Sequence, residues 1–154
     1  MINKAYLEPK IIEKLVDAFK NNNPIGLQLT SFMDKNSYAL FLKTIDNANF
    51  IKKEVRDMFS FFEAENANLK LFKTHEFLSF CSALSGKKIK KSEPYLRMFM
   101  KGCYTLIHEE TAKKGIEFFF DLTSKWNANF GGNIVYLAYD GSKVITPQYP
   151  NSLI

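Results

Sequence analysis

Residues 102–111 read GCYTLIHEET, and this stretch bears most directly on both the fold and the function. An apolar run ends at His108, and Glu109 and Glu110 follow it directly. Because successive side chains of a strand point to opposite faces, we expect His108 and Glu110 to share one face and Glu109 to point away. One imidazole and one carboxylate in this arrangement can reach a common metal ion.

Two interpretations of this motif follow from the residues alone. Non-haem Fe(II) sites use two histidines and one carboxylate on one face of an octahedron, so His108 and Glu110 supply two of three ligands. An isolated histidine at the end of a strand is also commonly structural, held by ordinary hydrogen bonds. His75, the other histidine, lies in a helical segment upstream and is expected to be structural or on the surface.

Length and composition indicate one packed globular domain, residues 1–154. The chain is 46% hydrophobic with 15 phenylalanines and 24% charged residues, which argues against disorder. No apolar run reaches the roughly 18 residues that span a bilayer, and the start MINKAYLEPK lacks the apolar core of a signal peptide. We therefore expect a cytoplasmic protein with no membrane partner. Cys81 and Cys103 lack the spacing of a disulfide framework or a zinc knuckle.

The charge pattern gives no strong nucleic-acid signal. The net charge is +5, and the densest basic stretch is GKKIKKSEP at residues 86–94. Four lysines beside the end of a helical segment are typical of a solvated loop. A nucleic-acid footprint would need a larger basic surface.

Helical spacing dominates residues 1–86. The segment from Glu8, with IIEKLVDAF, places its apolar residues on one helical face. IGLQLTSF alternates like a half-buried strand, and DKNSYALFLKTI returns to helical spacing. A further helix is expected over much of IKKEVRDMFSFF. The last helix is KTHEFLSFCSALSG, with Thr74 as a candidate N-cap and Gly86 as the stop.

The character of the sequence changes after Gly86, and residues 95–154 read as a sheet. The segments YTLIHEE, GIEFFFDL, GGNIVYLAY and SKVITP are short runs of aromatic and β-branched residues, separated by turn residues such as YDGS. Helices followed by several short strands predict an α+β domain, with N-terminal helices packed on an antiparallel sheet.

Three blocks of the C-terminal half resemble the prolyl-hydroxylase-like 2-oxoglutarate and Fe(II)-dependent oxygenases. These blocks are MFMKGCYTLIHEE, GIEFFFDLTSKWNANFGGNIVYL and VITPQYPNSLI, and the helical half resembles the N-terminal part of the same family. Similar order and spacing, rather than any single motif, carry the resemblance. The matching positions are Gly102, His108, Glu110, Leu122, Trp126, Gly131, Gly132, Ile145, Pro147 and Asn151.

The resemblance implies a double-stranded β-helix, or jelly roll, with helices on its outer face. His108 and Glu110 would bind Fe(II), and Phe99, Asp121 and Ile134 would stand at the 2-oxoglutarate site. From the residues themselves we expect Trp126 to pack rather than bind. We also expect the Gly131–Gly132 pair to permit a tight turn before a strand, with positive φ or close backbone packing.

Several departures from the family pattern argue against activity. Glu110 replaces the usual Asp, Phe99 replaces a Tyr whose hydroxyl bonds the co-substrate, and Asp121 replaces a second Tyr and would repel a dicarboxylate. The second iron histidine and the basic residue that pairs with 2-oxoglutarate would follow Ile154. The last strands of the jelly roll are thus expected to be missing. A shortened chain, a degenerate relative and a protein completed by a second chain all fit this pattern.

Two functions remain open at this stage. One is a dioxygenase that hydroxylates a protein or small-molecule substrate, possibly at proline, with Fe(II) and 2-oxoglutarate as cofactors that this chain alone binds weakly or not at all. The other is a non-catalytic binding or assembly module that uses an open sheet edge to hold a partner. The partner would be a protein substrate or a completing second chain.

Overall fold

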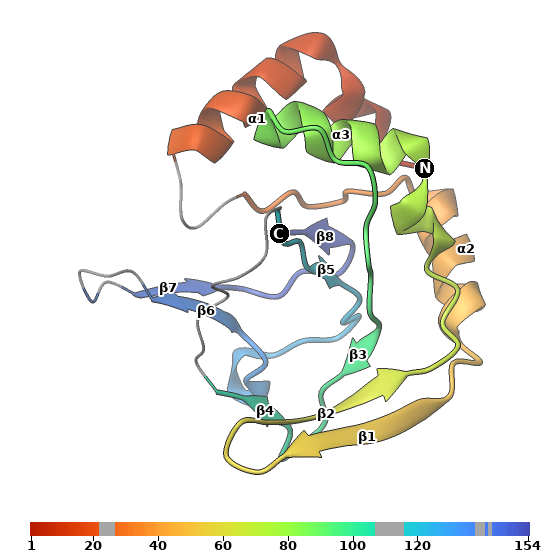
Figure 1. Ribbon diagram of the computed structural model, residues 1–154, viewed down its shortest axis with the longest axis vertical. Helices are drawn as coiled ribbons and strands as arrows, with labels where there is room; N and C mark the ends of the chain where they lie inside the picture. Colours follow the sequence, from red (N-terminus) through yellow and green to blue (C-terminus); the bar gives the residue numbers. More distant parts are fainter. Residues whose placement is uncertain (22–26, 107–115, 138–140, 142) are drawn as a thin grey trace.

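The computed structural model describes residues 1–21, 27–106, 116–137, 141 and 143–154 (Figure 1). The α-helices of this part are α1 (Pro9–Asn21), α2 (Lys35–Ile45) and α3 (His75–Ser85), and the 3-10 helices are η1 (Lys4–Leu7), η2 (Lys70–Lys73) and η3 (Ala128–Phe130). The strands are β1 (Phe50–Val55), β2 (Phe59–Ala64), β3 (Arg97–Met98), β4 (Tyr104–Thr105), β5 (Phe120–Asp121), β6 (Ile134–Leu137), β7 (Lys143–Thr146) and β8 (Ser152–Leu153). Helices combined with antiparallel sheets confirm the α+β class.

Local sequence signals account for the three α-helices, which confirm the corresponding predictions. α1 starts at Pro9, whose ring suits a first helical turn. Asp34 caps α2 by accepting a hydrogen bond from the Ser37 amide at 2.9 Å. Thr74 caps α3, and Gly86 ends it in the left-handed conformation with φ of 65°. Within the described ranges no helix is both long and apolar enough to cross a bilayer.

The predicted helix over IKKEVRDMFSFF is wrong, because this segment forms the β1–β2 hairpin. Ile51, Val55 and Met58 happen to be spaced like one face of a helix, but the hairpin places every residue of β1 opposite one of β2. Asp57 makes the turn with φ of 60°. The sheet therefore begins at Phe50, and the predicted division between helices before residue 86 and strands after it is also wrong.

β2 is the central strand of a four-stranded antiparallel sheet. β1 pairs with one edge of β2, and β3 and β4 both pair with the other edge. The turn over 100–103, closed by the Cys103 amide donating to the Met100 carbonyl at 2.9 Å, separates β3 from β4. β3 and β4 thus pair one after the other with the same edge of β2, with residues 99–103 between them.

The remaining strands form two antiparallel pairs, one nested in the other along the sequence. β6 pairs with β7 in a hairpin, and β5 pairs with β8, which places Phe120 opposite Leu153 and Asp121 opposite Ser152. The predicted strand at IGLQLTSF appears in residues 27–32 only as an isolated bridge from Leu29 to Leu153. The sheets of the described residues do not close into a barrel, so a jelly roll is not confirmed.

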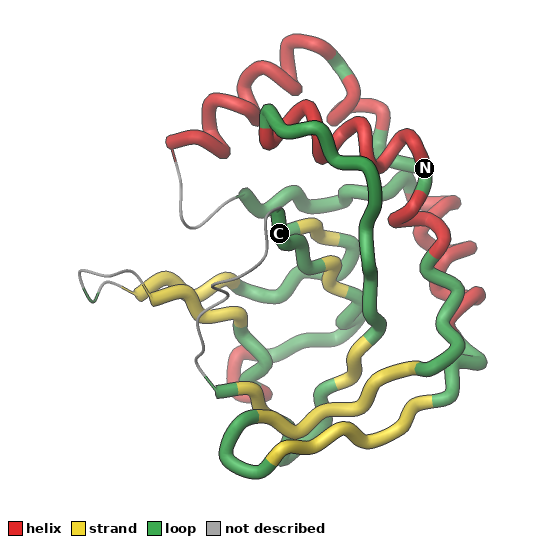
Figure 2. Tube along the Cα trace, in the orientation of Figure 1, coloured by secondary structure: helices red, strands yellow, loops and turns green. Residues whose placement is uncertain are grey.

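The core is an aromatic cluster between the helices and the β5–β8 pair. α1 and α3 lie side by side at one end of the molecule, and the β1–β4 sheet lies at the other end (Figure 2). Phe72 is 4% exposed, and its ring centroid lies 5.3–5.6 Å from those of Phe41, Phe77, Phe118 and Phe120. Tilted and edge-on ring pairs of this kind add stabilisation beyond area burial.

Replacing Phe72 by Ala removes a ring in contact with four others and leaves a cavity. We expect the free energy of unfolding to fall by about 3–5 kcal/mol, measured by urea denaturation. Phe130→Ala is the matched control, because Phe130 is 73% exposed and should change stability little. Equal effects of the two variants would contradict the placement of the core.

Candidate functional site

The predicted metal ligands His108 and Glu110 lie outside the described residues. β4 ends at Thr105 ahead of them, and β5 begins at Phe120 after them. Within the described ranges, no group of three or more His, Cys, Asp or Glu side chains could hold a metal ion. His75 is exposed on α3, where its ring lies 3.4 Å from the Ser79 hydroxyl, as expected of a surface histidine.

The three predicted co-substrate residues lie on three separate elements. Phe99 follows β3 and is 50% exposed, and its ring centroid lies 5.7 Å from that of Phe61. Ile134 is half-buried on β6 opposite Thr146. Asp121 is buried on β5 opposite Ser152. Among the described side chains, no hydrogen bond, ion pair or ring contact joins these three residues.

Buried oxygen atoms gather instead around Asp121. Asp121 is 8% exposed and Ser152 is 0% exposed. Asp121 Oδ1 accepts a hydrogen bond from the Thr123 amide at 2.8 Å, whereas Asp121 Oδ2, Ser152 Oγ and Tyr38 Oη have no hydrogen-bond partner in the described part of the chain. Burial and the nearby Asp121 carboxylate raise the pKa of the Tyr38 hydroxyl. Sequence reasoning found Asp121 but missed Tyr38 and Ser152, because neither stands in a recognisable motif.

Asn151 joins three separate parts of the chain beside these oxygens. Its side-chain amide makes two hydrogen bonds of 2.9 Å to the backbone of Met33, accepting from the amide and donating to the carbonyl. Its backbone accepts from the Phe32 amide and donates to the Asp121 carbonyl, both at 2.9 Å. Asn151 also has φ of 59°, a left-handed conformation that asparagine adopts more readily than most residues.

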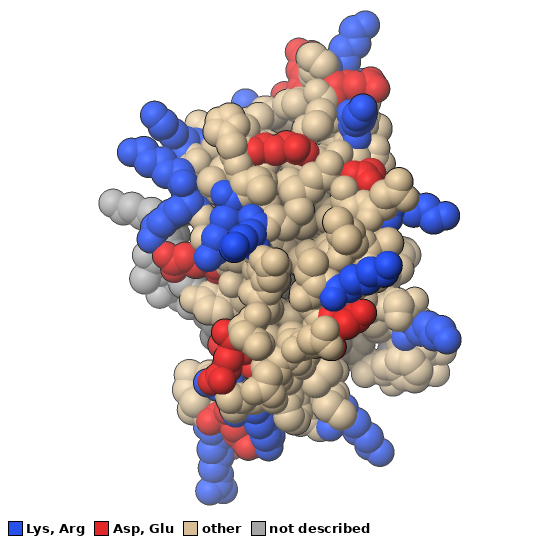
Figure 3. All heavy atoms as spheres, turned by 90° about the vertical axis from the view of Figure 1, so that its right-hand side faces the viewer, with Lys and Arg blue, Asp and Glu red and all other residues tan. Residues whose placement is uncertain are grey.

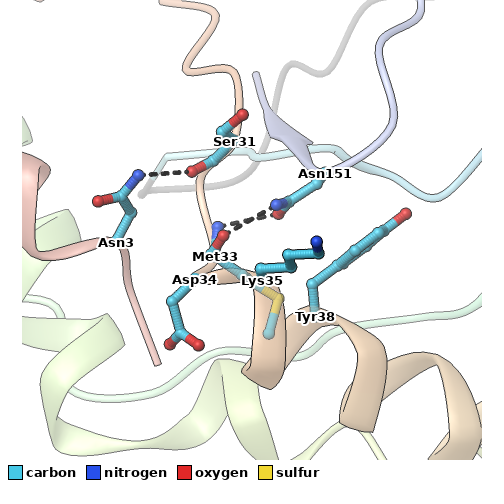
Figure 4. A pocket seen from close by; sticks show the side chains of 7 residues that line it. All are labelled: Asn3, Ser31, Met33, Asp34, Lys35, Tyr38 and Asn151. Carbon is cyan, nitrogen blue, oxygen red and sulfur yellow. Dashed lines mark hydrogen bonds between the residues drawn. The ribbon is translucent and has the colours of Figure 1, made fainter.

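A surface hollow of about 480 Å³ lies between the N-terminal segment, the start of α2 and Asn151 (Figure 4). It is lined by Asn3, Ser31, Met33, Asp34, Lys35, Tyr38 and Asn151. Much of its polar lining is already bonded within the protein, since Asn3 donates to the Ser31 carbonyl at 3.2 Å and Asn151 is bonded to Met33. The hollow therefore offers few unused groups to a ligand.

Trp126 and the glycine pair behave as structural residues. The Trp126 indole nitrogen donates a hydrogen bond to the Gly131 carbonyl at 2.7 Å. Gly131 and Gly132 have φ of 69° and 76°, which confirms the predicted positive φ at the turn before β6. A similarly inert role holds for Cys81, because burial raises the pKa of its thiol to about 12 and keeps it protonated.

A scan against models of known protein families finds no match for the chain, and no similar curated protein is found.

Replacing Asn151 by Asp tests the importance of its amide group. The variant keeps the size and backbone preference of the residue but removes the donor to the Met33 carbonyl and places two acceptors face to face. We expect a loss of about 1–3 kcal/mol in the free energy of unfolding, measured by urea denaturation. Asn47→Asp, at an exposed turn residue, is the control and should change little. A neutral Asn151→Asp would mean that the bonds to Met33 contribute no net stability.

Asp34 gives the fold a pH dependence in the acid range. Hydrogen bonds from the backbone and side chain of Ser37 and from the N-terminal amino group lower its pKa from 3.8 to about 2. A carboxyl with a lowered pKa stabilises the folded state above its unfolded pKa, and this stabilisation is lost as the pH falls towards the folded value. Compared with Asp34→Asn, the wild type should lose melting temperature between pH 3.8 and 2. A difference between the two proteins that stays constant over this range would contradict the assignment.

Proposed function

We propose that the chain is related to the prolyl-hydroxylase-like 2-oxoglutarate and Fe(II)-dependent oxygenases, which hydroxylate protein or small-molecule substrates. In this proposal His108 and Glu110 are two iron ligands, and the strands belong to a double-stranded β-helix. The chain by itself holds metal and 2-oxoglutarate weakly. The order of motifs along the sequence and the pairing of the C-terminal strands support this proposal.

The observation that carries the proposal is the nested pairing of β5 to β8. The β6–β7 hairpin lies, along the sequence, inside the β5–β8 pair, and both pairs are antiparallel. A jelly roll folds a long antiparallel ribbon over on itself, so its strand pairs are nested in this way. The His-x-Glu motif stands between β4 and β5, as the resemblance requires of a metal-binding strand end followed by the strand that finishes at Leu122.

The described residues supply no complete iron site of their own. Among them, no group of three or more His, Cys, Asp or Glu side chains could hold a metal ion. Asp121, at a predicted co-substrate position, contributes a buried negative charge that opposes a dicarboxylate. We therefore expect this chain alone to bind both groups weakly.

The alternative, a non-catalytic binding module, is supported by exposed apolar side chains. Much exposed apolar surface lies on the β1–β4 sheet, where Met58, Phe99 and Met100 are each at least 50% exposed. Figure 3 shows basic and acidic side chains interspersed around uncharged surface on one face. A protein partner suits this face better than a polyanion does.

The two histidines allow a matched test of the metal proposal. Manganese(II) binding is measured by electron paramagnetic resonance under anaerobic conditions for the wild type, His108→Ala and His75→Ala. We expect weak binding by the wild type, a loss of about tenfold or more in affinity for His108→Ala, and no change for His75→Ala. Glu110→Gln should behave like His108→Ala.

Equal manganese affinity for the wild type and His108→Ala would refute the metal site and favour the binding module. Micromolar binding of both manganese and 2-oxoglutarate by the chain alone would contradict the expected weakness, because it would show that another residue completes the site. If the chain is a binding module, His108→Ala should also leave the thermal stability in the presence of manganese unchanged. The wild type should then form no succinate from 2-oxoglutarate.

A further inference from the structure

The Asp121 and Ser152 side chains form a buried pair that the proposed function does not use. The two residues are directly opposite each other in the antiparallel β5–β8 pair. Residues opposite each other across such a pair project their side chains to the same face, with Cβ atoms about 5 Å apart. Since they are 8% and 0% exposed, the carboxylate and the hydroxyl share one buried neighbourhood.

The Asp121 carboxylate has little to compensate its charge. One oxygen accepts the Thr123 amide at 2.8 Å, and the other, Oδ2, has no hydrogen-bond partner in the part of the chain that the structure describes. The ion pairs of the described residues involve Asp34, Glu54, Asp57, Glu63, Glu76 and Glu93, and not Asp121. Buried carboxylates are normally paired with a cation or held by several donors.

We propose that Asp121 and Ser152 bind one monovalent metal cation such as sodium or potassium. Both candidate ligands are oxygen atoms, which suit hard cations. The single carboxylate balances one positive charge, whereas a divalent ion would leave a net positive charge buried. A bound water molecule could satisfy the hydrogen bonds but would leave the charge uncompensated. This site is independent of His108 and Glu110 and has a structural role at the β5–β8 junction.

The test compares melting temperatures in sodium, potassium and tetramethylammonium chloride at equal ionic strength. The tetramethylammonium ion is too large for a buried site and serves as the reference. The wild type should melt at a higher temperature in sodium or potassium, and Asp121→Asn should remove this difference. Asp57→Asn is the matched control, because Asp57 is exposed in the β1–β2 turn, where asparagine suits its φ of 60°. The control should keep the dependence on the cation.

A further variant and a direct measurement identify the ligands. Ser152→Ala should raise the cation concentration needed for half of the stabilisation by about tenfold, because it removes one oxygen. Crystals soaked in thallium(I), a potassium analogue with a strong anomalous signal, should show one site between Asp121 and Ser152. If Asp121→Asn does not fold, the wild-type salt comparison and the thallium site still decide the matter.

Equal melting temperatures of the wild type in all three salts would overturn the proposal. So would the lack of a thallium site together with an Asp121→Asn variant that is as stable as the wild type in every salt. Those results would mean that a water molecule or a proton, rather than a metal cation, satisfies the buried carboxylate.

Discussion

The hydrogen bonds of residues 151–154 hold the two ends of the fold together, and most of the tertiary structure depends on them. Leu153 exchanges backbone hydrogen bonds with Leu29 at 2.7 and 3.0 Å, and Ile154 does the same with Phe119 at 2.9 Å. Asn151 adds its bonds to Met33 and Phe32. β8 therefore lies between an early segment of the chain and β5, and it is antiparallel to both.

The position of β8 between these two segments determines which side chains of β5 and β8 face the core. Phe120 and Leu153, opposite each other in β5 and β8, join the aromatic cluster that also contains Phe32 and Phe72. Strand alternation then turns Asp121 and Ser152 to the opposite face. The same two short strands thus complete the apolar core on one side and bury unpaired oxygens on the other. Because Phe120 and Leu153 face the core, strand alternation places the Asp121 and Ser152 side chains together on the other face.

The sequence predicted those parts of the structure whose causes are local. Thr74 and Gly86 are the caps of α3, as predicted, and Gly131 and Gly132 have the positive φ expected of their turn. The β1–β2 hairpin was mistaken for a helix because its pairing with β3 and β4, more than thirty residues later, overrides an apolar spacing that suits a helix. The partners of Asn151, 118 residues away, left no local signal at all. Tyr38 and Ser152 were not predicted for the same reason. The metal-binding role of His108 and Glu110 stays a prediction.

The long separation between Met33 and Asn151 has a consequence during protein synthesis. A ribosome adds about 5–20 residues per second, so the 118 residues between these partners take on the order of ten seconds to translate. Throughout that interval Leu29 and Phe32 have emerged without the strand that later covers them. The nascent chain therefore exposes an extended apolar segment for longer than most local folding steps require. This delay sets the time during which chaperones or other nascent chains can bind the exposed segment.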